Sequence, residues 1–259
     1  MAIHSHIQIP KTILRHFRDE TDSEKKVWYL NVATNQIAKK SANLLGTSKG
    51  YYSNEGEEYW SKTIEDPIGK LNLQVLAFCS GEIKTTAFQP NDMEVVKRYI
   101  QSAMVRSESA FTAMKKVITN PEEYTEQQMH DALSVIGMSV VGEITDELNF
   151  NKMVASILVN RTARSFVVPR NCFYCVERNS YPNYIMPISP KGALLLLPKE
   201  QLENGIGNYG VIDDPEQVRR LNRHALKYEC LINGAFVAAD CRAELEDLQK
   251  LLMNPPWQN

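Results

Sequence analysis

Residues 163–200 read ARSFVVPRNCFYCVERNSYPNYIMPISPKGALLLLPKE and carry the densest β-strand signal of the chain. Short runs of β-branched, aromatic and leucine residues alternate there with proline, asparagine and glycine, a pattern typical of strands joined by turns. One run, residues 185–188, contains Pro187, which cannot donate to a neighbouring strand, so we expect an edge strand there. We therefore expect residues 163–198 to form a small antiparallel sheet together with N-terminal strands such as residues 26–32.

The segments on either side of this stretch are predicted to be helical, over about residues 55–160 and 213–252. Apolar residues recur at helical spacing between Asp92 and Thr119. Asp214, Pro215 and Glu216 supply a cap, a proline at the first helical position and an acid at the positive end of a helix. Residues 150–159 fit either a helix or an entering strand. We predict an α+β fold, mainly helical with a small antiparallel sheet.

Composition indicates an ordinary soluble protein. The chain has 259 residues, 43% of them hydrophobic and 23% charged, and a formal net charge of −2. This length can bury a substantial core, and we expect one compact domain over residues 1–259. The charge gives no global reason to bind nucleic acid or an anionic membrane, although a local basic patch could still do so. The N-terminus lacks the apolar region of a secretory signal and no apolar run could span a bilayer, so we expect a cytoplasmic protein with no membrane partner.

Five cysteines make an odd number, which favours a reducing compartment over a disulfide scaffold. Cys172 and Cys175 have metal-ligand or redox spacing, but a structural zinc site needs four ligands. Cys230 and Cys241 do not complete one at a usual spacing, so two half-buried thiols on a strand are the favoured interpretation. The sequence has no phosphate-cradling glycine loop and no His-Glu-x-x-His motif, and we expect neither a metal nor another cofactor.

Arg219 and His224 have the Arg-x4-His spacing of a superfamily of helical ribonucleases, the HEPN type. In such enzymes the histidine performs acid–base work while the arginine stabilises charge on the scissile phosphate. The spacing is short and frequent by chance, so a solvated basic helix face is the favoured interpretation. The same face also contains Arg220, Arg223 and Lys227, which could grip phosphate.

Short motifs follow one another over nearly the whole chain. They are Ile9-Pro10 with Leu14-Arg15-His16-Phe17, Glu65 in TIEDPIGKL, Arg106 in IQSAMVRSESAF, Phe166 to Phe173, Pro187-Ile188-Ser189-Pro190, and Leu221-Asn222 leading to Val237. In this order they resemble the bacterial domain-of-unknown-function family 4238. That family opens with a His-x-x-Pro-Gln-Phe-like motif and Leu-Arg-x-Phe, and it continues with an acidic helix, an Arg-bearing helix, a Ser-Asp-Asn-Pro strand end, Pro-Leu-Ser-Pro and a late Leu-Asn helix.

The chain departs from the family pattern at several places, one of them Lys11, which stands where the family has a glutamine after the proline. Ile7 stands where the family has its first histidine, and Arg170 stands at the aspartate of Ser-Asp-Asn-Pro. If that histidine and aspartate form a catalytic pair, this chain has lost at least half of it. The resemblance implies binding residues at five positions, Glu65, Arg106, Arg170, Asn171 and Asn222.

Arg106 lies on an otherwise apolar helix, and a buried arginine needs a partner, for which Glu65 and Glu143 are candidates. We interpret such a pair as structural rather than catalytic. As a function we expect a binding or interaction protein, with another protein or nucleic acid as partner, in a phage, plasmid or defence-type setting. The alternative is a nuclease, with or without a metal, that uses Arg219 and His224 or the diverged N-terminal and Arg170 sites.

Overall fold

The computed structural model describes residues 4–6, 9–84, 88–116, 118–132, 136–138, 150–178, 181–203, 209–232 and 235–257. The strands are β1 (His4–His6), β2 (Val27–Asn31), β3 (Gln36–Lys40), β4 (Thr47–Lys49), β5 (Met153–Asn160), β6 (Val168–Pro169), β7 (Tyr174–Arg178), β8 (Tyr181–Ser189), β9 (Gly192–Pro198), β10 (Tyr209–Ile212) and β11 (Phe236–Ala239). The helices are α1 (Lys11–Leu14), η1 (Arg15–Phe17), α2 (Asn54–Trp60), η2 (Ser61–Glu65), α3 (Asp66–Cys79), α4 (Pro90–Val105), α5 (Glu108–Lys115), η3 (Pro121–Glu123), η4 (Phe150–Lys152), α7 (Lys199–Glu203), α8 (Pro215–Ile232) and α9 (Arg242–Met253).

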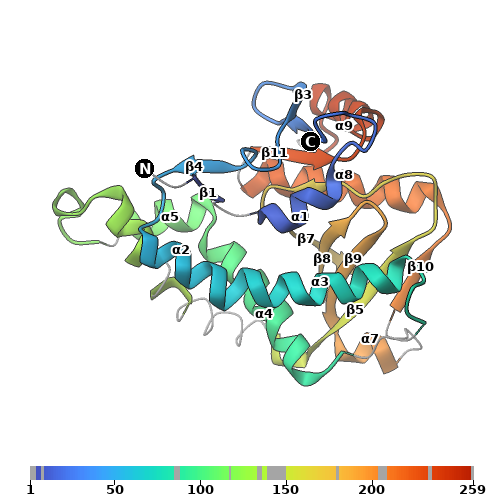
Figure 1. Cartoon of the computed structure of the whole chain (residues 1–259), viewed down its shortest axis with the longest axis horizontal. Helices are drawn as coiled ribbons and strands as arrows, with labels where there is room; N and C mark the ends of the chain where they lie inside the picture. Colours follow the sequence, from blue (N-terminus) through green and yellow to red (C-terminus); the bar gives the residue numbers. More distant parts are fainter. Residues whose placement is uncertain are drawn as a thin grey trace.

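The larger sheet has five strands in the order β10-β5-β9-β8-β7. Only the β10–β5 pair is parallel. The central strand β9 is an unbroken apolar run because both of its faces are covered. Leu194 and Leu196 belong to the core cluster that includes α3 and α4, whereas Ala193 and Leu195 face the cluster that includes α8. Figure 1 shows α3 crossing in front of these strands, with α1 above it.

The smaller sheet has four antiparallel strands in the order β3-β2-β11-β6. It joins the two ends of the chain, because β11 pairs with β2 in a register that sets Phe236 opposite Asn31. Leu245 and Leu248 of α9 pack in the same core cluster as Leu30 of β2. A further pair of strands, β1 and β4, is antiparallel.

This architecture corrects the predicted fold class. The protein is α+β with sheets of five and four strands among the described residues, so the prediction of a mainly helical fold with one small sheet is wrong. Residues predicted as mostly helical supply β5, and β10 and β11 also lie outside the predicted sheet segment. The apolar spacing of residues 153–158 fits a helix, but pairing with β9 and β10 on both sides makes this segment a strand.

Pro187 lies in an interior strand, not in the edge strand that was predicted. β8 pairs with β9 on one side and β7 on the other. The pairing with β7 runs only from Tyr181 to Ile185, so Pro187 lies beyond the end of β7. On the β7 side, therefore, no strand lies opposite Pro187 that would need a hydrogen-bond donor from it. The pairing with β9 shifts its register between Pro187 and Ser189.

One continuous helical segment runs from α2 through the π-helical turn η2 into α3. Pro67 lies in the first turn of α3. The wider π turn precedes it, where the proline ring would clash with the carbonyl of an ordinary α-helix. None of the helices that the structure describes is long and apolar enough to cross a bilayer.

Candidate functional site

A buried ion pair joins two of the motif segments. Arg106 Nη1 lies 3.3 Å from Glu65 Oε1, and the guanidinium stacks 4.8 Å from the centre of the Trp60 ring. The Arg106 side chain is 1% exposed and that of Glu65 is 26% exposed. Burial alone would lower the pKa of Arg106, but Glu65 and the phenols of Tyr52 and Tyr99 raise it, so the arginine stays charged. Glu143, the other predicted partner, lies outside the described residues.

Local sequence explains where these two groups lie. Glu65 is the last residue of the π-helical turn, a feature that is frequent at functional sites. Arg106 is the C-cap residue of α4. The helix ends there because the side chain of Ser107 bonds both the last turn of α4 and the first turn of α5. The Ser107 hydroxyl donates to the Met104 carbonyl at 2.7 Å and accepts from the Ala110 N–H at 3.2 Å.

Glu65 opens into a cleft of about 380 Å³ between the α1–η1 segment and α3. Ile13, Leu14 and Phe17 are fully buried, and this turns the other side of the segment toward the cleft. Such a volume suits a small molecule. The lining residues are Thr12, Arg15, His16, Glu65, Asp66, Gly69, Lys70, Asn72 and Leu73.

Asn72 is the unusual member of this lining. Asn72 is only 3% exposed. Its Oδ1 atom is buried and has no hydrogen-bond partner in the described part of the chain. An unsatisfied buried acceptor costs about 1–3 kcal/mol, so such a group requires an explanation. A turn of this side chain toward the cleft would bring Oδ1 to a ligand that donates a hydrogen bond.

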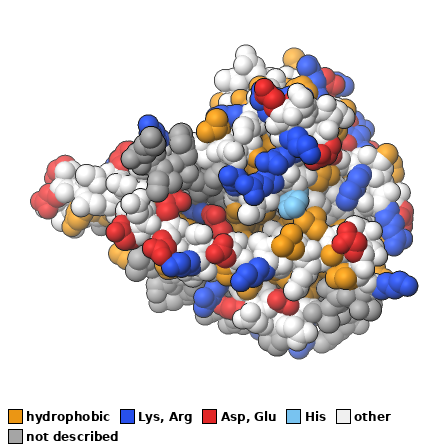
Figure 2. All heavy atoms as spheres, viewed as in Figure 1, with side chains coloured by type: hydrophobic (Ala, Val, Ile, Leu, Met, Phe, Trp, Pro, Cys, Tyr) orange, Lys and Arg blue, Asp and Glu red, His pale blue; other side chains and the backbone are white. Residues whose placement is uncertain are grey.

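The rim of the cleft carries charges of both signs. Arg15 and Lys70 are cationic, whereas Asp66 and Glu65 are anionic. Burial, with Arg15 and Arg18 nearby, lowers the pKa of His16, so its imidazole is neutral at pH 7. Figure 2 shows Lys and Arg side chains gathered over α1, while acidic side chains lie mostly toward the α2 end. The cleft can therefore bind an anion at its rim and a hydrogen-bond donor at its floor.

A third motif segment, residues 166–173, lies near the Arg106–Glu65 ion pair. Cys172 is fully buried near Tyr99 and Arg106, and its Sγ–H donates to the Arg170 carbonyl at 3.8 Å. Asn171 N–H donates to Glu229 Oε2 of α8 at 3.4 Å, and Ala235 N–H donates to Glu229 Oε1 at 3.3 Å. Burial raises the pKa of Glu229 to about 7, while these hydrogen bonds and Arg170 lower it. Arg170 therefore lies beside a carboxylate, although the family's own acid is missing there.

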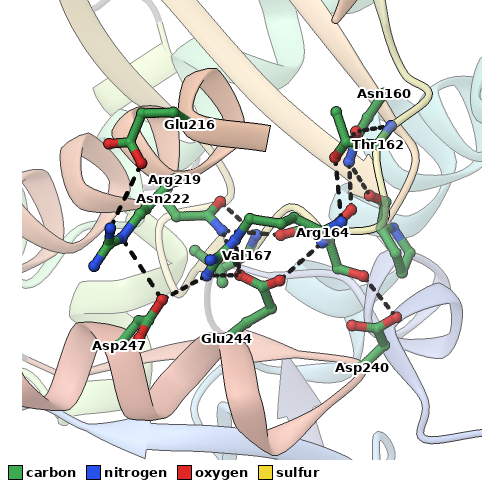
Figure 3. Close-up of polar contacts among 12 residues, drawn as sticks. Asn160, Thr162, Arg164, Val167, Glu216, Arg219, Asn222, Asp240, Glu244 and Asp247 are labelled. Atoms are coloured by element: carbon green, nitrogen blue, oxygen red, sulfur yellow. Dashed lines mark hydrogen bonds and ion pairs between the residues drawn. The ribbon is translucent and has the colours of Figure 1, made fainter. Parts of the chain in front are cut away.

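Asn222 serves a separate role, in a clamp on the connection between β5 and β6 (Figure 3). Its Oδ1 accepts from Val167 N–H at 3.0 Å, and its Nδ2 donates to the Ser165 carbonyl at 2.9 Å. Arg164 in the same connection donates to Glu244 Oε2 at 2.9 Å and to Asp247 Oδ2 at 2.8 Å. These contacts satisfy the buried polar groups of an extended segment that pairs with no strand before Val168. We assign Asn222 a structural role.

Arg219 and His224 have different surroundings on α8. Arg219 lies 3.6 Å from Asp247 and 3.5 Å from Glu216, and Figure 3 shows it at the margin of the clamp. His224 instead lines a separate hollow of about 270 Å³ with Cys175 and Lys227. Burial and then Lys227 lower its pKa. Arg219 does not line this hollow.

The two cysteines of the Cys-x-x-Cys motif also lie in different surroundings. Cys172 faces Tyr99 in the core, and burial raises its pKa to about 12. Cys175 on β7 is half-buried and lines the His224 hollow. Among the residues that the structure describes, no group of three or more His, Cys, Asp or Glu could hold a metal ion.

The cleft residues other than Glu65 were not predicted as site residues, nor was Glu229. Arg15 and His16 are adjacent to a buried apolar turn, which is a weak signal. Asn72 stands on the buried stripe of α3 between Leu71 and Val75, and a polar residue on such a stripe is the signal that could have been noticed.

Comparison with known proteins agrees with the motif resemblance. The family model described as protein of unknown function (DUF4238) matches residues 6–230. No curated protein and no solved structure gives a significant match to the chain. The match covers the motif segments that meet at the cleft and extends through the clamp residue Asn222. The chain belongs to the DUF4238 family, whose function is unknown.

Proposed function

We propose that this protein is a binding protein and that its ligand site is the cleft between the α1–η1 segment and α3. The observation that carries this proposal is Asn72 Oδ1, a buried acceptor without a partner on the wall of a cavity of about 380 Å³. Glu65 adds a second acceptor on the same wall, held in place by Arg106. Glu65 is open to the cleft, whereas Asn72 Oδ1 is buried in the cleft wall and meets a ligand donor only if its side chain turns toward the cleft.

The charges of the cleft define the class of ligand. Asn72 and Glu65 call for an amino, amide or hydroxyl group, while Arg15 and Lys70 call for an anionic group such as a carboxylate or a phosphate. A small molecule that carries both kinds of group, as an amino acid or an aminated sugar acid does, satisfies them together. Arg170 in place of the family's aspartate supports binding over catalysis.

Ligand-observed NMR with matched compound pairs tests this proposal. Each pair consists of an amino acid and the same carboxylic acid without the amino group. The two compounds therefore differ only in the group that would donate to Asn72 and Glu65. We expect amino acids to bind and their partners to bind more weakly by about tenfold or more. Asn72→Leu and Glu65→Gln should remove this preference, while Arg98→Gln, at an exposed position of α4, should keep it. Equal binding of both members of each pair to the unaltered protein would contradict the proposal.

Phosphodiester cleavage is the competing function, with Arg219 and His224 as its residues. The same purified protein is incubated with labelled RNA and DNA, with and without a divalent metal. We expect both substrates to stay intact, because Arg219 does not line the hollow that His224 lines. If the protein cleaves either substrate and His224→Ala abolishes the cleavage, the function is that of a nuclease and the binding proposal is wrong.

A further inference from the structure

A second cavity, of about 550 Å³, lies where the C-terminal end of α3 meets β10. It is separate from the ligand cleft, because the two cavities share no lining residue. Its lining is Phe78, Cys79, Ser80, Gly81, Ile83, Lys84, Val159, Asn160, Arg161, Lys191 and Tyr209. We call this the α3–β10 cavity.

Every charged side chain in this lining is a cation. Lys84, Arg161 and Lys191 are exposed, and none of them forms an ion pair with a carboxylate whose side chain the structure describes. Lys191 Nζ donates to the carbonyls of Thr162 and Arg164, both at 2.7 Å, which holds its ammonium at a defined place. Three cations without a balancing carboxylate in the lining are suited to an anion with more than one negative oxygen.

The end of α3 does not oppose such an anion strongly. Its last carbonyl groups, which would repel negative charge, accept hydrogen bonds from the following backbone. Ser80 N–H donates to Leu76, Gly81 N–H to Phe78 and Ile83 N–H to Ala77, at 2.9, 3.1 and 3.2 Å. Gly81 makes this turn possible with a φ of +81°, which favours glycine.

An aromatic pair lies beside the cations. Tyr209 contacts Phe78 edge-to-face, with ring centres 5.1 Å apart. Tyr209 is 48% exposed and Ile83 is 39% exposed, so apolar surface remains open to solvent next to Arg161 and Lys84. A partly exposed tyrosine beside unpaired cations is the combination with which proteins stack a base and hold its phosphate.

We infer that the α3–β10 cavity binds a phosphorylated nucleoside, with the base on Tyr209 and the phosphate between Arg161, Lys84 and Lys191. The same chemistry is offered by a free mononucleotide and by a single strand of nucleic acid. The cavity has the volume of a site for one nucleotide rather than for a duplex.

Isothermal titration calorimetry with adenosine monophosphate and with inorganic phosphate tests the inference on the full chain. A fluorescein-labelled oligothymidine of about ten nucleotides, read by polarisation, serves as the strand probe. We expect the monophosphate, the strand or both to bind, and inorganic phosphate to bind more weakly because it lacks a base to stack. Strand binding alone would identify nucleic acid as the source, and monophosphate binding alone would identify the free nucleotide.

Variants locate the binding. The double variant Lys84→Gln with Arg161→Gln should weaken binding by about tenfold or more, since two charged contacts are lost. Tyr209→Ala should remove the preference for the nucleotide probes over inorganic phosphate. The matched control Arg98→Gln on α4 should change neither the nucleotide affinity nor this preference. The inference is overturned if no nucleotide probe binds the unaltered protein, or if the double variant and Arg98→Gln bind equally well. Asn72→Leu separates this site from the ligand cleft, because it should leave nucleotide binding unchanged.

Discussion

Glu65 and Arg106 are 41 positions apart in the chain, and their side chains meet at 3.3 Å. The arginine is fully buried, and its partner is open to the cleft. The ion pair therefore connects the core of the protein to its candidate ligand site. A ligand that contacts Glu65 would sense this pair directly.

Removing the carboxylate should harm the protein more than removing the whole pair. Glu65→Gln removes the carboxylate that pairs with the buried Arg106 at 3.3 Å, and breaking a buried pair costs about 3–5 kcal/mol. The double change Glu65→Gln with Arg106→Met removes the buried charge as well, and its unfolding free energy should lie above that of Glu65→Gln. Urea denaturation of the two variants and the unaltered protein measures this order. A double variant less stable than Glu65→Gln would contradict it.

Asn72→Leu should stabilise the ligand-free protein. The change replaces a buried acceptor without a partner by an apolar side chain of similar size, which should raise the free energy of unfolding by about 1 kcal/mol. Leu73→Asn, on the exposed side of α3 but also at the cleft, is the positional control and should not stabilise. Thermal unfolding without ligand reads the difference. A gain in stability together with lost binding is typical of sites selected for function, whereas a loss of stability would show that Asn72 supports the fold.

The clamp residue Asn222 should be important for stability but not for binding at the cleft. Asn222→Ala removes two hydrogen bonds to the backbone of residues 165 and 167 and leaves those groups buried. We expect a loss of about 2–4 kcal/mol of unfolding free energy. Arg219→Gln, at the partly exposed margin of the same clamp, should cost less than about 1 kcal/mol. Denaturant titration compares them, and equal losses would contradict the buried role of Asn222.

Glu229 should make stability depend on pH near neutrality. Burial raises the pKa of Glu229 to about 7 in the folded protein, while its usual value of 4.5 applies to the unfolded chain. Between these values the folded state holds a proton that the unfolded state has released, so stability falls as pH rises through this window, by about 3 kcal/mol in total.

Denaturant titrations between about pH 5 and 7 test this dependence, and Glu229→Gln should flatten it, since glutamine does not titrate there. The exposed Glu246→Gln is the control and should keep the slope of the unaltered protein. Stability that rises with pH in this window for the unaltered protein would show that the carboxylate is ionised in the fold.

Local patterns in the sequence predicted much of the secondary structure and the family. The cap, the proline and the acid predicted at residues 214–216 stand at the start of α8, which begins at Pro215. These features depend on neighbours within one or two turns, which is why the sequence alone was sufficient. The motif segments, read in order, also identified the family.

The tertiary structure decided the rest. Residues 153–160 form a strand because β9 and β10 pair with them. Pro187 fits inside a sheet because the pairing of β8 with β7 stops at Ile185. The cleft needed the α1–η1 segment to be brought against η2 and α3, and only then did Asn72 stand out as a buried acceptor without a partner in the described part of the chain. Strand pairing and hydrogen-bond satisfaction depend on residues that are distant in the chain, so spacing alone could not predict them.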